Sequence, residues 1–205
     1  SCHIIAHKYQ VTSVCVSDDG AMVYSGGIDN IIRQWDIRQV GNSSGVKPSL
    51  ELPGCADSVT GLDLNSENTM LLSNSMDRSL KIWDIRPFSV STAAAATTTT
   101  TTTTSVTGPP EFDSNLFSPR LTKTLTGVHH GAEKLLLRCN WSANSRMVTG
   151  GSADRMTHIF DAETGEEKYL LPGHKASVND CILHPTQKLI ASCSSDKSII
   201  IGELL

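Results

Sequence analysis

The sequence has 205 residues, a formal net charge of -4, 39% hydrophobic residues and 5% aromatic residues. That length suits one domain or two small ones, and the apolar content is sufficient for a folded core. The mild acidity provides no basic face that could displace counterions from phosphates, although it does not exclude RNA contact through a local patch. RNA contact is expected to be at most indirect. No apolar run approaches the roughly 18 residues that a membrane-spanning helix needs, and no membrane association is predicted.

Four segments of the chain repeat one another. They cover residues 6–38, 54–86, 127–162 and 173–204. Each combines short β-branched and apolar runs of strand length with tight turns, and none shows a sustained helical period. Strand-only repeats of this length are typical of four-stranded propeller blades, so we predict an all-β propeller with four blades present.

The first repeat follows the segment SCHIIA (1–6), which predicts the outer strand of a preceding blade. Its runs VTSVCV, MVYSG and IIRQWDI predict three strands. It contains His7, Ser25, Asp29 and Trp35, with His7 22 residues before the Asp and Trp35 six residues after it. The second repeat keeps the spacing from Asp to Trp, but it has Cys at the His position. Its counterparts are Cys55, Ser73, Asp77 and Trp83.

Residues 89–119 interrupt the pattern between the second and third repeats. This stretch is rich in Ala and Thr and carries several Pro residues, without the apolar periodicity of a packed element. We therefore predict a disordered surface insertion. It separates residues 1–88 from residues 120–205, which are predicted to belong to the same propeller.

The third and fourth repeats are less regular. In the third, Phe160 stands at the Trp position six residues after Asp154, and His130 lies 24 residues before that Asp, which indicates a loop two residues longer. The fourth repeat contains His174, Ser192 and Asp196 but has Gly at the Trp position, residue 202.

Two interpretations compete for the recurring His, Ser and Asp. Ser25, His7 and Asp29 are the residue types of a hydrolase triad. A nucleophilic site would occur once, however, whereas this set recurs in degraded copies, which favours a structural role. The six cysteines form no C-x-x-C pair, and His129-His130 has no accompanying ligand cluster, so no metal site and no cofactor are predicted. Cysteine usage of this kind favours a reducing compartment.

Trp35-Asp36 and Trp83-Asp84 carry the dipeptide that names the WD-repeat family, which the chain resembles over all four repeats. SGGIDN at 25–30, ADSVTGL at 56–62 and SSDKSIIIGEL at 194–204 are similar to WD-repeat proteins of the U5 small nuclear ribonucleoprotein. The resemblance implies a seven-bladed ring, and therefore three further blades before this sequence. It also implies a nuclear, non-catalytic scaffold in pre-mRNA splicing, whose partners are the large U5 scaffold protein and other spliceosomal proteins, with no small-molecule substrate.

The same resemblance implies a buried network in each blade that links His, Ser, Asp and Trp. Its members here would be His7, Ser25, Asp29, Trp35, Ser73, Asp77, Trp83, His130, Asp154, His174, Ser192 and Asp196. Partner docking is expected at the loops that enter each blade. The candidate residues are Tyr9, Gln10, Thr12, Asp57, Thr60, Lys134, Lys175 and Asn179.

Two alternatives stay open. The chain could be a WD-repeat adaptor of another complex, such as a substrate receptor of a ubiquitin ligase or a subunit of a chromatin corepressor. It could also be a hydrolase that uses Ser25, His7 and Asp29. A pulldown that tests for U5 RNA distinguishes the splicing scaffold from the adaptor of another complex. A serine-reactive probe distinguishes the scaffold from the hydrolase.

Overall fold

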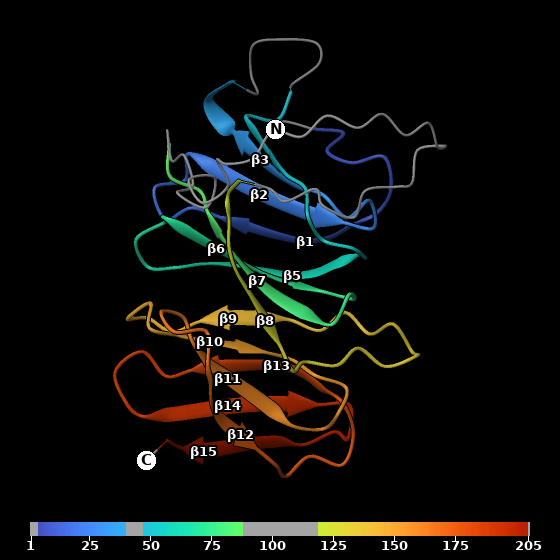
Figure 1. Ribbon diagram of the computed structural model, residues 1–205, viewed down its shortest axis with the longest axis vertical. Coiled ribbons are helices and arrows are strands. Elements are labelled where there is room, and N and C mark those ends of the chain that lie inside the picture. Colours follow the sequence, from blue (N-terminus) through green and yellow to red (C-terminus); the bar gives the residue numbers. More distant parts are fainter. Residues whose placement is uncertain (1–3, 40–46, 88–118, 205) are drawn as a thin grey trace, which may run out of the picture.

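The computed structural model describes residues 4–39, 47–87 and 119–204. In these ranges the chain forms fifteen strands and one short 3-10 helix, η1 (Ile37–Gln39), and the strands assemble into four antiparallel sheets (Figure 1). The predicted all-β architecture of repeated sheets is confirmed. No helix in the described part of the chain is long and apolar enough to cross a membrane.

The first three strands of each sheet come from one sequence repeat, and each sheet is called a blade below. Blade 1 contains β1 (Val11–Val16), β2 (Met22–Gly27), β3 (Ile32–Asp36) and β4 (Leu50–Leu52). Blade 2 contains β5 (Val59–Leu64), β6 (Met70–Ser75), β7 (Ser79–Asp84) and β8 (Leu121–Thr126). Blade 3 contains β9 (Cys139–Trp141), β10 (Met147–Gly150), β11 (Thr157–Asp161) and β12 (Glu167–Leu171). Blade 4 contains β13 (Val178–Leu183), β14 (Leu189–Ser194) and β15 (Ile199–Glu203).

The hairpin between the second and third strand of every blade turns at the recurring Asp. The residue after that Asp has a positive φ in all four blades, which lets the chain reverse in a tight turn. These residues are Asn30, Arg78, Arg155 and Lys197. The Asp carboxylate accepts the N–H two residues further on in blades 2, 3 and 4. This local chemistry explains why the spacing from the Asp to the third strand is constant.

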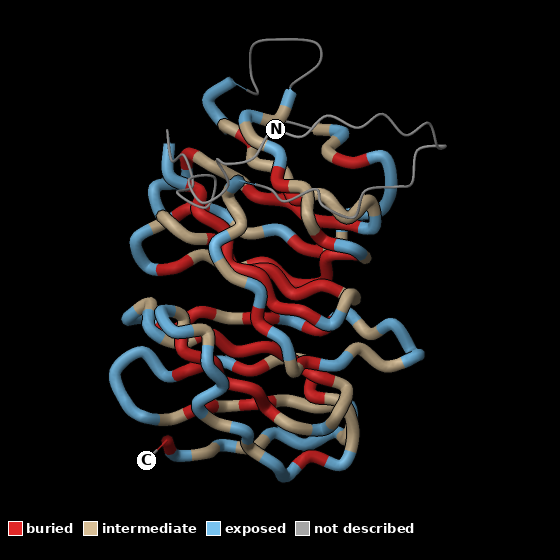
Figure 2. Tube along the Cα trace, in the orientation of Figure 1, coloured by how far each residue is buried: buried red, intermediate tan, exposed pale blue. Residues whose placement is uncertain are grey.

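The blades stack through three apolar clusters, one at each seam. Figure 2 shows the buried residues along the strands and the exposed residues at the turns. Leu62 and Trp83 of blade 2 pack with Tyr24 of blade 1. Leu80 of blade 2 packs with Phe160 of blade 3, and the third cluster joins blades 3 and 4. The first strands β1, β5, β9 and β13 consequently lie side by side in blade order.

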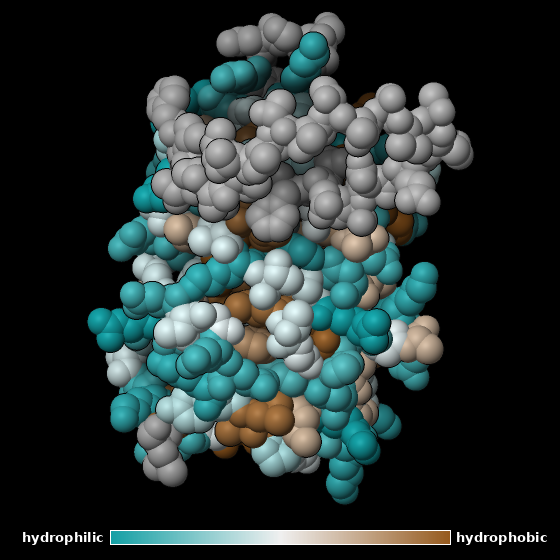
Figure 3. All heavy atoms as spheres, viewed as in Figure 1, coloured by the Kyte–Doolittle hydropathy of each residue, from teal (hydrophilic) through white to brown (hydrophobic). Residues whose placement is uncertain are grey.

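Blade 4 leaves apolar side chains exposed on the face that points away from blade 3. Ile182, Ile199 and Ile201 are 58%, 73% and 71% exposed. Blade 1 exposes Val14 and Val16 of its first strand. Elsewhere, on the side of the molecule shown in Figure 3, hydrophobic residues appear in separate patches among hydrophilic ones.

Two sequence expectations meet the structure differently. Residues 4–6, the described part of the outer strand predicted for residues 1–6, belong to no strand. That strand would pair with a preceding blade, which the described residues do not include, so this expectation stays a prediction. The insertion predicted for residues 89–119 lies, apart from its last residue, outside the described residues.

Candidate functional site

The structure brings the four network residues of blade 1 together. Trp35 Nε1 donates to Ser25 Oγ at 2.8 Å, and Ser25 Oγ lies 2.7 Å from His7 Nε2. His7 Nδ1 lies 2.8 Å from Asp29 Oδ1. Ser25 can donate to Nε2 while Nδ1–H donates to the carboxylate. Arg33 Nη1, which lies 2.6 Å from Nδ1, then donates to the second carboxylate oxygen of Asp29. The result is a continuous chain of hydrogen bonds from the third strand to the entry loop.

Blade 4 keeps the His, Ser and Asp part of this network. His174 Nε2 lies 2.9 Å from Ser192 Oγ, and its Nδ1 lies 3.1 Å from Asp196 Oδ2. Asp196 also accepts the backbone N–H of Lys175 at 2.8 Å. Hydrogen bonds from Ser198 and from the Lys175 backbone hold the pKa of Asp196 well below its usual range. Gly202 provides no indole donor at the far end.

Blade 2 keeps the Trp, Ser and Asp of the network, but no His links the Ser to the Asp. Trp83 Nε1 donates to Ser73 Oγ at 2.8 Å. Cys55 is buried at the His position, and burial raises the pKa of its thiol to about 12, so it stays neutral and apolar. Asp77 instead accepts the backbone N–H of Ala56 at 2.9 Å, which ties it to the entry loop without an imidazole.

A basic residue four positions after the turn Asp was missed by the sequence interpretation. Arg33, Lys81 and His158 pair with Asp29, Asp77 and Asp154, respectively. Burial raises the pKa of these carboxyls, but donated hydrogen bonds outweigh it and lower all three pKa values. The signal was present in the sequence, because Asp-x-x-x-Arg, Lys or His occurs in three of the four repeats.

His130 does not occupy the network position assigned to it in blade 3. Its Nε2 lies 2.9 Å from Asn74 Oδ1 of blade 2, and the carboxylate of Asp154 pairs with His158 Nε2 at 2.8 Å. The second ring nitrogen of His158 contacts Glu167 of β12. The extra length of the entry loop carries His130 across the seam, which leaves its place to a His on the third strand.

Burial decides how the hydrolase-like set of blade 1 is best interpreted. Ser25 is 4% exposed, and the side chain of His7 has no exposed surface. Ser25 Oγ is already engaged by Trp35 and His7 on both sides. A substrate therefore has no path to this hydroxyl, and the arrangement orients side chains in a packed interior.

The loops that enter the blades and the Asp turns lie at the same ends of the sheets, because each first strand begins where the second strand ends. We call this side of the molecule the network face. Tyr9, Gln10, Lys134 and Lys175 are exposed on it, and Tyr9 is 57% exposed. Asp57 and Asn179 are half-buried there. These six docking candidates share one face, and in blades 1, 2 and 4 the entry loop is hydrogen-bonded to the turn Asp.

The two threonines predicted to dock partners serve the seams between blades instead. Thr60 is fully buried, and its hydroxyl contacts Asn74 O at 3.2 Å and Leu137 O of blade 3 at 2.8 Å. Thr12 is half-buried, and its hydroxyl contacts Val59 O of blade 2. Both occupy a β-bulge at the start of a first strand. A bulge turns the side chain toward the neighbouring blade, so Thr60 is not part of a docking surface.

The described residues contain no group of three or more His, Cys, Asp or Glu side chains that could hold a metal ion. Cys139 and Cys181 are buried, and burial raises the pKa of both thiols. Thiols of this kind pack as small apolar groups.

Comparisons with known proteins identify the family of the repeats. The family model described as "WD domain, G-beta repeat" matches residues 1–36, 46–84 and 165–201. The chain is 41% identical over 204 residues to the U5 small nuclear ribonucleoprotein 40 kDa protein of Dictyostelium discoideum, covering 100% of this chain and 48% of that protein. It is 39% identical to the human protein of the same name, covering 97% and 46% of the two chains.

Pre-mRNA-splicing factor cwf17 of Schizosaccharomyces pombe is also 39% identical, with 98% of this chain and 49% of that protein covered. The chain thus spans about half the length of the curated relatives it matches. Among solved structures, a chain of the Mitotic Checkpoint Complex superposes with a TM-score of 0.69 at 19% identity, covering 94% of this chain and 47% of that one. At that identity the likeness concerns the fold alone.

Proposed function

We propose, from the premise that this chain belongs to the WD-repeat family, that it is a non-catalytic protein-interaction scaffold of the U5 small nuclear ribonucleoprotein in pre-mRNA splicing. The observation that carries this proposal is the similarity, over essentially all 205 residues, to proteins named as U5 components or splicing factors in three distant organisms. A single active site is hard to reconcile with polar sets that recur in different states of completeness.

The network face supports docking as the mode of action. Its exposed side chains, such as Tyr9 and Lys175, stand on loops that are hydrogen-bonded to half-buried Asp turns. A partner therefore meets a surface that loses little conformational entropy on binding. Exposed Tyr is a common anchor of binding energy at such surfaces. We assign the large U5 scaffold protein and neighbouring spliceosomal proteins as partners, and the nucleus as the location.

We also propose that the four blades belong to a larger ring of seven. Ile199 and Ile201 of blade 4 occupy the positions that Leu80 and Ile82 occupy in blade 2, where both are buried at the seam with blade 3. The exposed Val14 of blade 1 corresponds to Leu62, which is buried against blade 1. Both open faces thus have the composition of a seam between blades.

A pulldown from nuclear extract tests the functional proposal. We expect the tagged protein to recover U5 RNA together with the large U5 scaffold protein. A combined Tyr9→Ala, Lys134→Glu and Lys175→Glu variant should recover much less of both. Lys188→Glu, which lies at the opposite ends of the sheets in the turn between β13 and β14, serves as the matched charge control.

Two outcomes would contradict the proposal. Absence of any small nuclear RNA in a stringent pulldown would favour an adaptor of another complex. Covalent labelling of Ser25 by a serine-reactive fluorophosphonate would favour a hydrolase, because the reagent would have to reach a hydroxyl that is buried here.

A further inference from the structure

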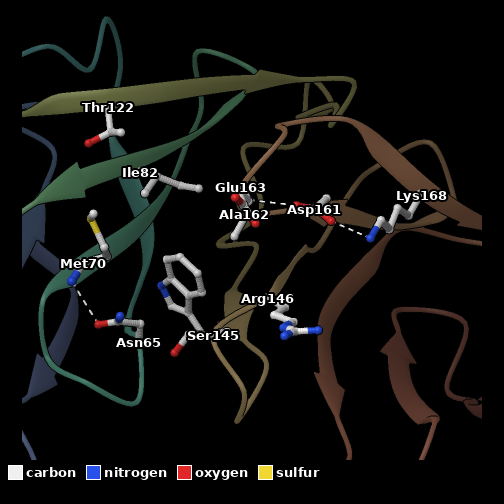
Figure 4. A pocket seen from close by; sticks show the side chains of 11 residues that line it. Asn65, Met70, Ile82, Thr122, Ser145, Arg146, Asp161, Ala162, Glu163 and Lys168 are labelled. Atoms are coloured by element: carbon white, nitrogen blue, oxygen red, sulfur yellow. Dashed lines mark hydrogen bonds and ion pairs between the residues drawn. The ribbon is translucent and has the colours of Figure 1, made fainter.

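A cleft opens at the seam between blades 2 and 3, on the side opposite the network face. Its volume is about 440 Å³, within the range of ligand-binding clefts. Asn65 of the β5–β6 turn and Arg146 of the β9–β10 turn stand on its two sides, as Figure 4 shows. These turns lie at the ends of the sheets away from the Asp turns, so the cleft is distant from the docking candidates described above.

The apolar surface of the cleft comes from both blades. Met70 and Ile82 contribute from blade 2, and Ala162 contributes from blade 3. Ile82 is 3% exposed, and Met70 and Ala162 pack against the same apolar cluster. A side chain that entered the cleft would thus rest on the core that joins the two blades.

Trp141 lines this cleft and differs from the other tryptophans of the chain. Trp35 and Trp83 each donate their indole N–H to a serine at 2.8 Å. Trp141 is 9% exposed, and its Nε1 has no hydrogen-bond partner among the described residues. An unpaired donor this well buried is rare in native structures. The flexible side chain of Met70 lines the same cleft, so a change of its rotamer can admit an acceptor.

Of two charged side chains at the cleft, one has an internal partner of opposite charge and the other does not. Asp161 is paired with Lys168 and accepts the backbone N–H groups of Glu163 and Thr164, and this lowers the pKa of its carboxyl to about 2. Its negative charge is therefore used within blade 3. Arg146 is exposed at the cleft and forms no ion pair with the described residues. The guanidinium can consequently meet a carboxylate from outside.

We propose that this cleft binds an extended peptide segment of a partner protein, in which an apolar side chain is flanked by an acidic residue. The apolar side chain occupies the surface of Met70, Ile82 and Ala162. A backbone carbonyl of the segment accepts the N–H of Trp141, and the acidic residue pairs with Arg146. Backbone carbonyls are regularly spaced along an extended segment, which makes a peptide the occupant that best meets the buried donor and the exposed cation together.

A phage-displayed library of random dodecapeptides, panned on the purified protein, tests this site. We expect enriched sequences to share an apolar residue next to Asp or Glu. A fluorescein-labelled peptide of the enriched sequence should bind about tenfold more weakly to Arg146→Glu. Exchanging the acidic residue of the peptide for Lys should restore binding to that variant. Arg155→Glu makes the same charge change on the network face and should leave peptide binding unchanged.

Trp141→Phe isolates the indole donor. We expect it to weaken peptide binding severalfold. Its thermal midpoint should also fall, because the smaller ring leaves a cavity in the buried cluster, so binding is compared well below that midpoint. The proposal is overturned if panning yields no shared sequence. It is equally overturned if Arg146→Glu and Trp141→Phe bind the enriched peptide as tightly as the wild type does.

Discussion

At the scale of single residues, two kinds of group hold the turn aspartates. A basic residue four positions along the chain pairs with the carboxylate in blades 1 to 3, and an entry loop hydrogen-bonds to it in blades 1, 2 and 4. The blades differ in which groups do this, while the position of the Asp is constant. The network is therefore a set of interchangeable donors around one fixed acceptor.

Removal of the base in blade 2 should show how much this pairing contributes. Lys81 is 6% exposed and pairs with Asp77. Lys81→Met should lower the free energy of unfolding by about 2 kcal/mol, less than for a fully isolated buried charge, because backbone N–H groups still donate to Asp77. Lys168→Met, which removes an exposed pair, should change it by less than about 0.5 kcal/mol. Urea unfolding of both variants provides the comparison.

The pH dependence of the free energy of unfolding should also report on the hydrogen bonds of the turn aspartates. The pKa of Asp77 is lowered in the folded state, so its contribution is complete above the usual value of about 4 and is lost as pH falls through the lowered pKa. The destabilisation caused by Asp77→Asn should thus shrink between pH 5 and pH 3. Burial raises the pKa of Asp63, so its contribution is lost as pH rises, and the penalty of Asp63→Asn should change in the opposite direction. Equal slopes for the two variants would contradict this assignment.

Part of this site could be predicted from the sequence, for a geometric reason. The spacing from Asp to Trp is constant because a tight turn and one strand separate them, and that length cannot vary without disrupting the sheet. The entry loop has no such constraint, so an offset counted from Asp154 selected His130, which lies across the seam. His158 was overlooked because a residue within a strand pattern shows no sign of the partner it faces.

At the scale of the elements, the first strands both build the blades and join them. The bulge at the start of β1 and of β5 directs a threonine hydroxyl toward a backbone carbonyl of the next blade. Asn179 lies in the corresponding bulge of β13, and its carbonyl accepts the N–H of Arg138 at 2.8 Å. Sequence periodicity predicts the strands but not the bulges, since one extra residue in a short strand leaves no pattern.

Thr60→Val should therefore weaken the seam between blades 2 and 3. The substitution keeps the shape but leaves two buried carbonyl oxygens without the hydroxyl, at a cost of about 1–2 kcal/mol. Thr12→Val, at a half-buried position that water can reach, should cost less. Hydrogen exchange measured by mass spectrometry should show faster exchange in β5 and β9 for Thr60→Val. Loss of partner binding without loss of stability would instead restore Thr60 as a docking residue.

At the scale of the whole molecule, the stack of blades has two open apolar faces that match the buried seams in composition. Leu80 in blade 2 and Ile199 in blade 4 follow their turn Asp at the same distance, three residues, yet the first is fully buried and the second is 73% exposed. The two residues differ in exposure because a neighbouring blade covers Leu80, whereas no blade among the described residues covers Ile199. Apolar area of this kind is covered in stable soluble proteins, which is the physical basis for the proposed ring.

The 205-residue chain alone should consequently self-associate through these faces. We expect sedimentation velocity to show oligomers that grow with concentration, and a double Ile199→Lys, Ile201→Lys variant to shift the distribution toward monomer. Because both side chains are exposed, the variant should unfold at nearly the same urea concentration as the wild type. Leu80→Lys places the same charge at the equivalent buried position and should prevent stable folding. A wild-type chain that stays monomeric at high concentration would mean that these faces are tolerated in water, and the case for further blades would lose its physical support.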